Sequence, residues 1–92
     1  NMNEILQKCT ILGFMPCTVK ETHEEMIRTC IEIKSEKEGY YGSETKYIFL
    51  SDSEDKRNLL KRAVDDKSLD VYAKIALNIV NGTSKVVDII IK

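Results

Sequence analysis

The residues best suited to metal binding or nucleophilic chemistry are one histidine and three cysteines. His23 has no second histidine in an H-E-x-x-H spacing, and a metal site needs three or four converging ligands. A catalytic pair would need His23 to meet Cys17 or Cys30 across a hairpin, and no residue is recognisably placed to orient the imidazole. Cys-x-x-Cys spacing is also missing. We therefore predict no metal and no cofactor, and expect the cysteines to be small apolar strand residues: Cys9, Cys17 and Cys30.

Sequence motifs of other enzyme classes are missing as well. The chain contains no Walker A loop, no G-x-G-x-x-G and no G-x-S-x-G, and the Gly-Tyr-Tyr-Gly at 39–42 does not match a phosphate-binding loop. Adjacent acids at 24–25 and 65–66 fall in segments predicted as loops, where paired carboxylates usually serve solvation. We therefore predict that the protein is not an enzyme.

Aromatic and cationic residues indicate a different chemistry, the binding of single-stranded nucleic acid. Such binders combine a cationic groove with aromatic rings on which bases stack. Two tyrosines lie in a glycine-flanked segment, and an aromatic pair two residues apart shares one face of a predicted strand. Two cations share the polar face of the strand before it. The predicted binding residues are Arg28, Lys34, Tyr40, Tyr41, Lys46, Tyr47 and Phe49.

The orientation of these aromatic residues stays open in the sequence. Tyr47 and Phe49 form a binding face with Arg28 and Lys34 only if they point outward. Ile48 and Leu50 are equally able to be the exposed pair. The tyrosines at 40–41 are hard to bury in a loop, but they are also able to cover one end of a barrel. The basic residues of the segment 56–62 are bracketed by acids and are expected to form a solvated helix face.

The elements that must position these residues are mostly strands. Eleven Ile, six Val and six Thr favour strands throughout. We predict a long first strand from Ile5 to Val19, in which Gly13 marks a bulge or coil and Pro16 an edge or bend. Alternation of apolar and polar residues predicts the second strand, and an apolar run the third, at 27–34 and 46–50. A helix start follows at 51–55, with apolar residues at helical spacing up to Val64.

The segment 71–80 has two interpretations. Its alternating apolar residues favour a strand, and Asn81-Gly82 is a strong hairpin signal before a final strand at 85–91. A helix is the alternative, because Leu69, Tyr72, Ala73 and Ala76 also share a helical face. Two adjacent helices within 54–80 would be typical of a DNA-binding helix-turn-helix.

Composition bounds the class of protein. The chain has 92 residues, 14 Lys+Arg against 15 Asp+Glu, and 42% hydrophobic residues, as expected for one small globular domain over residues 1–92. Near-neutral charge argues against a polybasic nucleic-acid binder. The sequence shows no membrane span and no signal peptide, and Asn1 before Met2 indicates that Met2 is the native start. An odd number of cysteines then points to reduced thiols in the cytoplasm.

The order of three strands, one helix and two strands resembles the OB-fold, a five-stranded Greek-key barrel with its helix between strands three and four. The long first strand with Gly13 is similar to the coiled first strand of such barrels. The resemblance covers nearly the whole chain, is one of pattern, and implies a mainly β, small α+β fold. In size the chain is similar to small single-stranded DNA-binding proteins of phages and conjugative elements. That likeness implies a bacterial or mobile-element protein with a single-stranded nucleic-acid partner.

Two further expectations concern partners. The apolar strand that ends at Lys92 would be a natural edge for homodimer pairing. A protein-interaction adaptor on the same fold is the alternative function, and the near-zero net charge favours it.

Overall fold

The computed structural model describes residues 3–92, so the expected native start at Met2 lies outside the described residues. The chain is mainly β with one helix, in the order β-β-β-α-β-β, as predicted. The elements are β1 (Asn3–Thr18), β2 (Glu25–Lys34), β3 (Ser43–Ser51), α1 (Glu54–Asp65), β4 (Val71–Asn78) and β5 (Thr83–Ile91).

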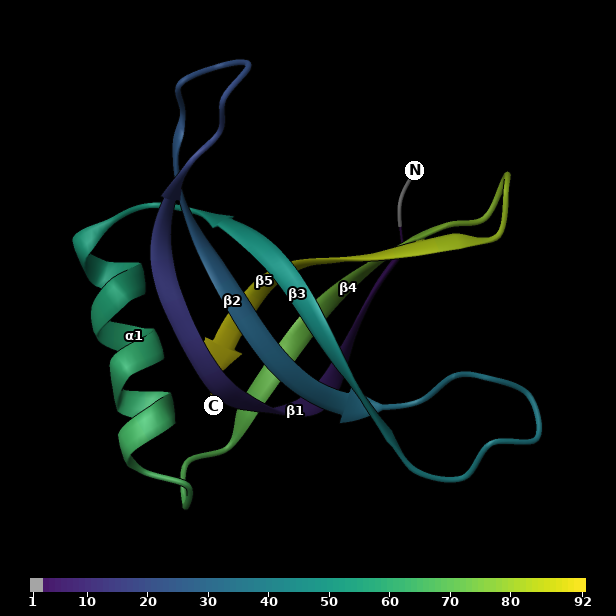
Figure 1. Cartoon of the computed structure of the whole chain (residues 1–92). Coiled ribbons are helices and arrows are strands. Elements are labelled where there is room, and N and C mark those ends of the chain that lie inside the picture. The colour runs from purple at the N-terminus through teal and green to yellow at the C-terminus, as the bar shows by residue number, and fades with distance from the viewer. Residues whose placement is uncertain (1–2) are drawn as a thin grey trace.

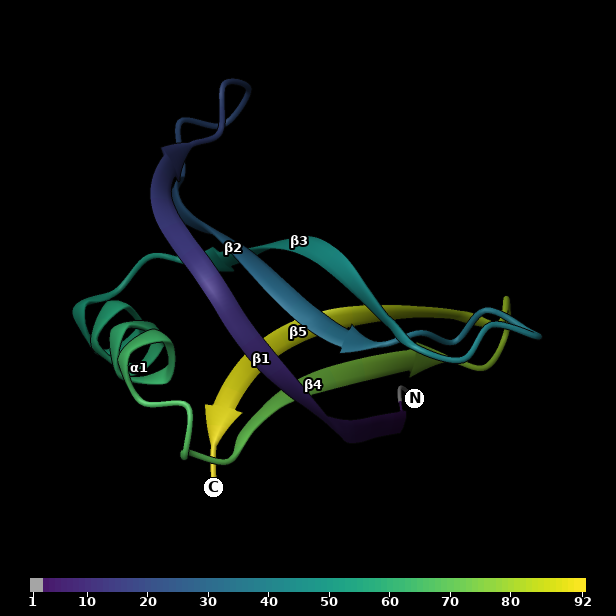
Figure 2. The same ribbon diagram turned by 60° about the horizontal axis from the view of Figure 1, so that its bottom comes forward.

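The five strands form one antiparallel sheet in the order β3-β2-β1-β4-β5. The sheet is strongly bent, so that β4 and β5 lie behind β2 and β3, and α1 lies beside one side of the sheet (Figures 1 and 2). Within residues 3–92 no hydrogen-bonded ladder joins β3 to β5, so the sheet is open between these two strands.

The long strand β1 produces the bend because it changes partner along its length. Its first part, Asn3–Lys8, pairs with β4, and its second part, from Cys9 onward, pairs with β2. The register with β2 shifts between Ile11 and Gly13, so the predicted irregularity at Gly13 is confirmed. Pro16 lies where β1 has only β2 as a neighbour, so β1 is a sheet edge at the position where the sequence predicts an edge or bend.

The segment after the helix is a strand, so the helix-turn-helix alternative is wrong. Val71, Ala73 and Ile75 point into the core and are at most 5% exposed. Burial of every second residue requires a strand, and the helical spacing of the apolar residues in this segment is therefore not used. The hairpin to β5 is also confirmed, but its loop spans residues 79–82, because Asn78 pairs with Thr83. Gly82 has φ +70° and donates its N–H to the Asn78 carbonyl at 2.9 Å.

The core fills the space between the bent sheet and α1. Every second residue of β2 is buried, and the most deeply buried large side chains come from β1, β2, β5 and the helix. These are Ile11, Ile27, Ile31, Leu60, Ile89 and Thr29.

The helix begins where the sequence predicts it. The Ser53 side chain caps it by accepting a hydrogen bond from the Lys56 N–H at 3.0 Å, and two acids occupy the first turn. Leu60 and Ala63 form its buried stripe. After the last turn, the hydroxyl and N–H of Ser68 donate to Asp66, which lowers the pKa of that carboxyl.

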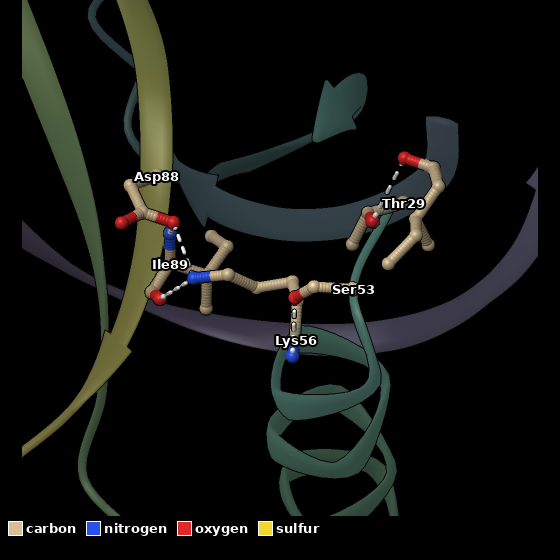
Figure 3. A network of polar contacts seen from close by, with 6 residues as sticks. Thr29, Ser53, Lys56, Asp88 and Ile89 are labelled. Carbon is tan, nitrogen blue, oxygen red and sulfur yellow. Dashed lines mark hydrogen bonds and ion pairs between the residues drawn. The ribbon is translucent and has the colours of Figure 1, made fainter. Parts of the chain in front are cut away.

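One lysine joins the helix to the edge strand β5 (Figure 3). The Lys56 ammonium donates to Asp88 Oδ1 at 2.5 Å and to the Ile89 carbonyl at 3.2 Å. Asp88 Oδ1 also accepts the Ile89 N–H at 2.8 Å. Both backbone groups of Ile89 are therefore bonded to side chains, which blocks this part of the β5 edge against pairing with another chain.

Replacing Lys56 by methionine is expected to lower the free energy of unfolding by about 1–2 kcal/mol, because Asp88 and the Ile89 carbonyl lose a charged donor while the side chain keeps its volume. Urea denaturation measures this difference. The matched control, Lys61→Met on the exposed side of α1, should change stability by less than about 0.5 kcal/mol. Equal effects of the two substitutions would contradict the assigned role of Lys56.

Candidate binding surface

The outer face of β1, β2 and β3 carries an exposed aromatic pair. Tyr47 is 56% exposed and Phe49 54% exposed, whereas Ile48 and Leu50 between and after them are buried at 9% and 4%. Ile48 and Leu50 point inward, where they pack in one core cluster with Ile27 and Ile31 of β2. Tyr47 and Phe49 therefore point outward, the orientation that the predicted binding face requires.

The strand register sets Arg28 beside both of these aromatic side chains. Arg28 lies opposite Phe49 on β3 and opposite Met15 on β1, and its guanidinium lies 4.0 Å from the centre of the Tyr47 ring. Within residues 3–92, Arg28 forms no ion pair. The guanidinium is thus positioned by a ring, and its donors remain free for a ligand.

A shallow depression adjoins this pair. It has a volume of about 130 Å³ and lies beside Gly13, Met15, Cys30 and Tyr47. A Cβ at Gly13 would meet no atom within 4 Å, so the glycine leaves the floor of the depression uncovered. We call the surface around it the aromatic face, which comprises Leu12, Met15, Arg28, Tyr47 and Phe49.

Sequence reasoning missed Leu12 and Met15, which are 46% and 53% exposed. The register shift in β1 explains Met15: a regular strand would place it on the inward side with Cys9 and Ile11, but the extra residue at the shift turns it outward. Gly13 was the available signal, because a glycine inside a strand marks such irregularities.

The two loop tyrosines lie at the other end of the β2–β3 hairpin. Tyr41 is 99% exposed and Tyr40 is 53% exposed, in the loop that projects beyond β2 and β3 in Figure 1. The Tyr40 ring packs over Gly42, where an added Cβ would lie 3.2 Å from the ring. Neither tyrosine covers the core, but they are not part of the aromatic face.

The two predicted lysines are also separate from the aromatic face. Lys46 follows the inward alternation of Ile48 and Leu50, although it is exposed near the end of β3. Lys34 shares the outward side of β2 with Arg28 but lies six residues further along, roughly 20 Å away. Of the seven predicted residues, the structure therefore brings together Arg28, Tyr47 and Phe49.

The residues considered for catalysis or metal binding do not gather. Within residues 3–92, no group of three or more His, Cys, Asp or Glu side chains is placed to hold a metal ion. His23 is exposed in the loop between β1 and β2, with φ +59°. Cys9 is buried, as its predicted strand role requires, and burial raises the pKa of its thiol to about 11.

This buried thiol predicts a loss of stability at high pH. In the unfolded chain Cys9 ionises near 9.0, whereas in the folded chain it keeps its proton up to about 11. The unfolded state therefore binds fewer protons over this interval, and stability falls as pH rises through it. Urea denaturation from pH 8 to pH 11 should show a loss about 2 kcal/mol larger for the wild type than for Cys9→Ala. Parallel pH profiles would contradict this prediction.

Comparison with protein-family models, with curated proteins and with solved structures gave no match. In the part of the chain that the structure describes, no helix is long and apolar enough to cross a membrane.

Proposed function

We propose that this protein binds single-stranded nucleic acid, without strong sequence preference, on its aromatic face. The observation that carries the proposal is the outward pair Tyr47 and Phe49, with the Arg28 guanidinium 4.0 Å from the Tyr47 ring. Each of these planar groups offers a surface on which a base of any sequence stacks.

The arrangement supports a simple binding mode. Tyr47 and Phe49 are two residues apart on one strand, so their rings are roughly 7 Å apart along β3. This spacing suits bases that are splayed from one another, as in single strands, rather than paired in a duplex. Arg28, held against Tyr47, has donors left for a phosphate oxygen.

An OB-like fold is part of this proposal. In such a Greek-key barrel, the outer surface of the second and third strands binds oligonucleotides. Two features support it: β1 pairs with both β2 and β4, and α1 connects β3 to β4. The gap between β3 and β5 would then be closed by side chains. Three free cysteines fit the reducing cytoplasm that we propose as the location.

The test is a titration of fluorescently labelled oligo-dT of roughly 15 nucleotides with the protein at low salt. We expect micromolar or tighter binding that weakens as salt rises from roughly 50 to 200 mM, because phosphate contacts release counterions. A duplex of the same length should bind more weakly. Failure to bind oligo-dT at low salt would overturn the proposal, since electrostatic attraction is strongest there.

A protein partner is the second candidate function. Leu12 and Met15 give the aromatic face aliphatic surface, and Arg28 is the one cation among the five residues that define it. Aromatic residues, Met and Arg are enriched in protein interfaces. If this candidate holds, Arg28→Ala and Met15→Ala will abolish capture of a partner while oligo-dT fails to bind. A second copy that pairs along β5 outside the blocked part at Ile89 would appear as a dimer in sedimentation velocity.

A further inference from the structure

A small cavity lies at the open side of the sheet, between β2, β3 and β5. Its volume is about 20 Å³, enough for one oxygen-sized group and too small for a whole ligand. Lysines from three strands line it: Lys34 of β2, Lys46 of β3 and Lys85 of β5. The other lining residues are Gln7, Ile33, Glu36, Ile75, Ser84 and Val86.

Charge at this cavity is unbalanced. One acid, Glu36, lines it beside the three lysines, whereas the whole chain has a formal net charge of −1. The ion pairs within residues 3–92 involve Lys8, Lys37, Lys56 and Arg57, and none of the three cavity lysines. The three lysines carry like charges at one cavity, so an anion that enters it would reduce their mutual repulsion.

We propose that the three lysines form a phosphate-binding subsite, in which a non-bridging oxygen of a phosphodiester enters the cavity. This inference rests on the proposed function, because it assigns the sugar-phosphate backbone of the bound strand to these residues. Gln7 and Ser84 supply neutral donors at the same cavity. The subsite lies at the end of the hairpin that carries Tyr40 and Tyr41, so one strand is able to contact the aromatic face and then the subsite.

The subsite is separate from the aromatic face in both position and chemistry. Lys34 lies six residues beyond Arg28 on β2, and Lys85 lies on a strand that contributes nothing to the aromatic face. Base stacking and phosphate binding are therefore separable by mutation. Stacking sets affinity at all salt concentrations, whereas phosphate contacts set its salt dependence.

The first experiment compares the triple variant Lys34→Gln, Lys46→Gln, Lys85→Gln with a control that carries Lys20→Gln, Lys61→Gln and Lys92→Gln. Both variants lose the same charge. We expect the slope of log affinity for oligo-dT against log salt to fall by about 0.7 in the first variant, the contribution of one single-strand phosphate contact, and to stay unchanged in the control. Equal slopes in the two variants would overturn the subsite.

The second experiment uses inorganic pyrophosphate, which has phosphate oxygens and no base. Added to ¹⁵N-labelled protein, it should shift the amide signals of Ile33, Ser84 and Val86, and the shifts should disappear in the triple variant. Shifts without oligo-dT binding would support an anion site while the proposed function fails. Oligo-dT binding without these shifts, and with an unchanged salt slope, would leave the proposed function standing and reject the subsite.

Discussion

Replacing both Tyr47 and Phe49 by alanine is expected to weaken oligo-dT binding about thirtyfold or more, a loss of at least about 2 kcal/mol. Each stacked base contributes roughly 1–3 kcal/mol, and these two rings are the exposed aromatic surface of the outer face. Because both side chains are more than half exposed, the double variant should unfold at nearly the urea concentration of the wild type. Fluorescence anisotropy measures the binding loss.

Two controls separate base stacking from general apolar contact. Phe49→Leu keeps an apolar side chain but removes the ring, so it should weaken oligo-dT binding, whereas a protein partner that needs only apolar area would tolerate it. The double variant Ile79→Ala, Val80→Ala truncates residues that are 69% and 93% exposed in the β4–β5 loop. It should bind oligo-dT normally, and an equal loss in this variant would contradict the assigned site.

Replacing Leu60 by alanine is expected to lower the free energy of unfolding by about 2–5 kcal/mol. Leu60 is the fully buried side chain of α1, 0% exposed, and it packs in the core cluster together with residues of the bent sheet. Truncation removes apolar contact and leaves a cavity that the surrounding strands only partly close. For a domain of this size, such a loss is a large share of total stability.

Thermal and urea denaturation both measure this effect. Leu59→Ala is the matched control, because Leu59 is adjacent on the same helix and only partly buried. It should lose clearly less stability than Leu60→Ala. Similar losses for both variants would mean that α1 does not anchor to the sheet through Leu60.

Local signals predicted most of the fold. Ser53 and the acids after it marked the helix start, and the alternation around Ile31 marked β2. Asn81-Gly82 correctly indicated a hairpin, but the four-residue loop was not predicted, because Asn78 extends β4 to pair with Thr83. The sheet is open between β3 and β5, and period-two patterns do not predict this, because they are insensitive to contacts between strands far apart in the sequence.

The candidate site was less predictable, since a period of two shows which residues share a face and not which face is buried. In β3 both faces are apolar, so Tyr47 and Phe49 compete with Ile48 and Leu50 for the core. Packing of β3 with β2 around the core buries Ile48 and Leu50 and leaves Tyr47 and Phe49 exposed. Lys46 is adjacent to Tyr47 in the sequence, but adjacent strand residues point to opposite sides of the sheet.

Photocrosslinking tests the central claim most directly, by identifying the residues that a bound strand touches. Oligo-dT that carries 5-iodouracil is bound, irradiated, and the protein is digested with trypsin. Cleavage after Lys37, Lys46 and Lys56 separates the loop tyrosines, in peptide 38–46, from Tyr47 and Phe49, in peptide 47–56. We predict the adduct on peptide 47–56. A saturated complex whose adducts lie only on other peptides would contradict binding at the aromatic face.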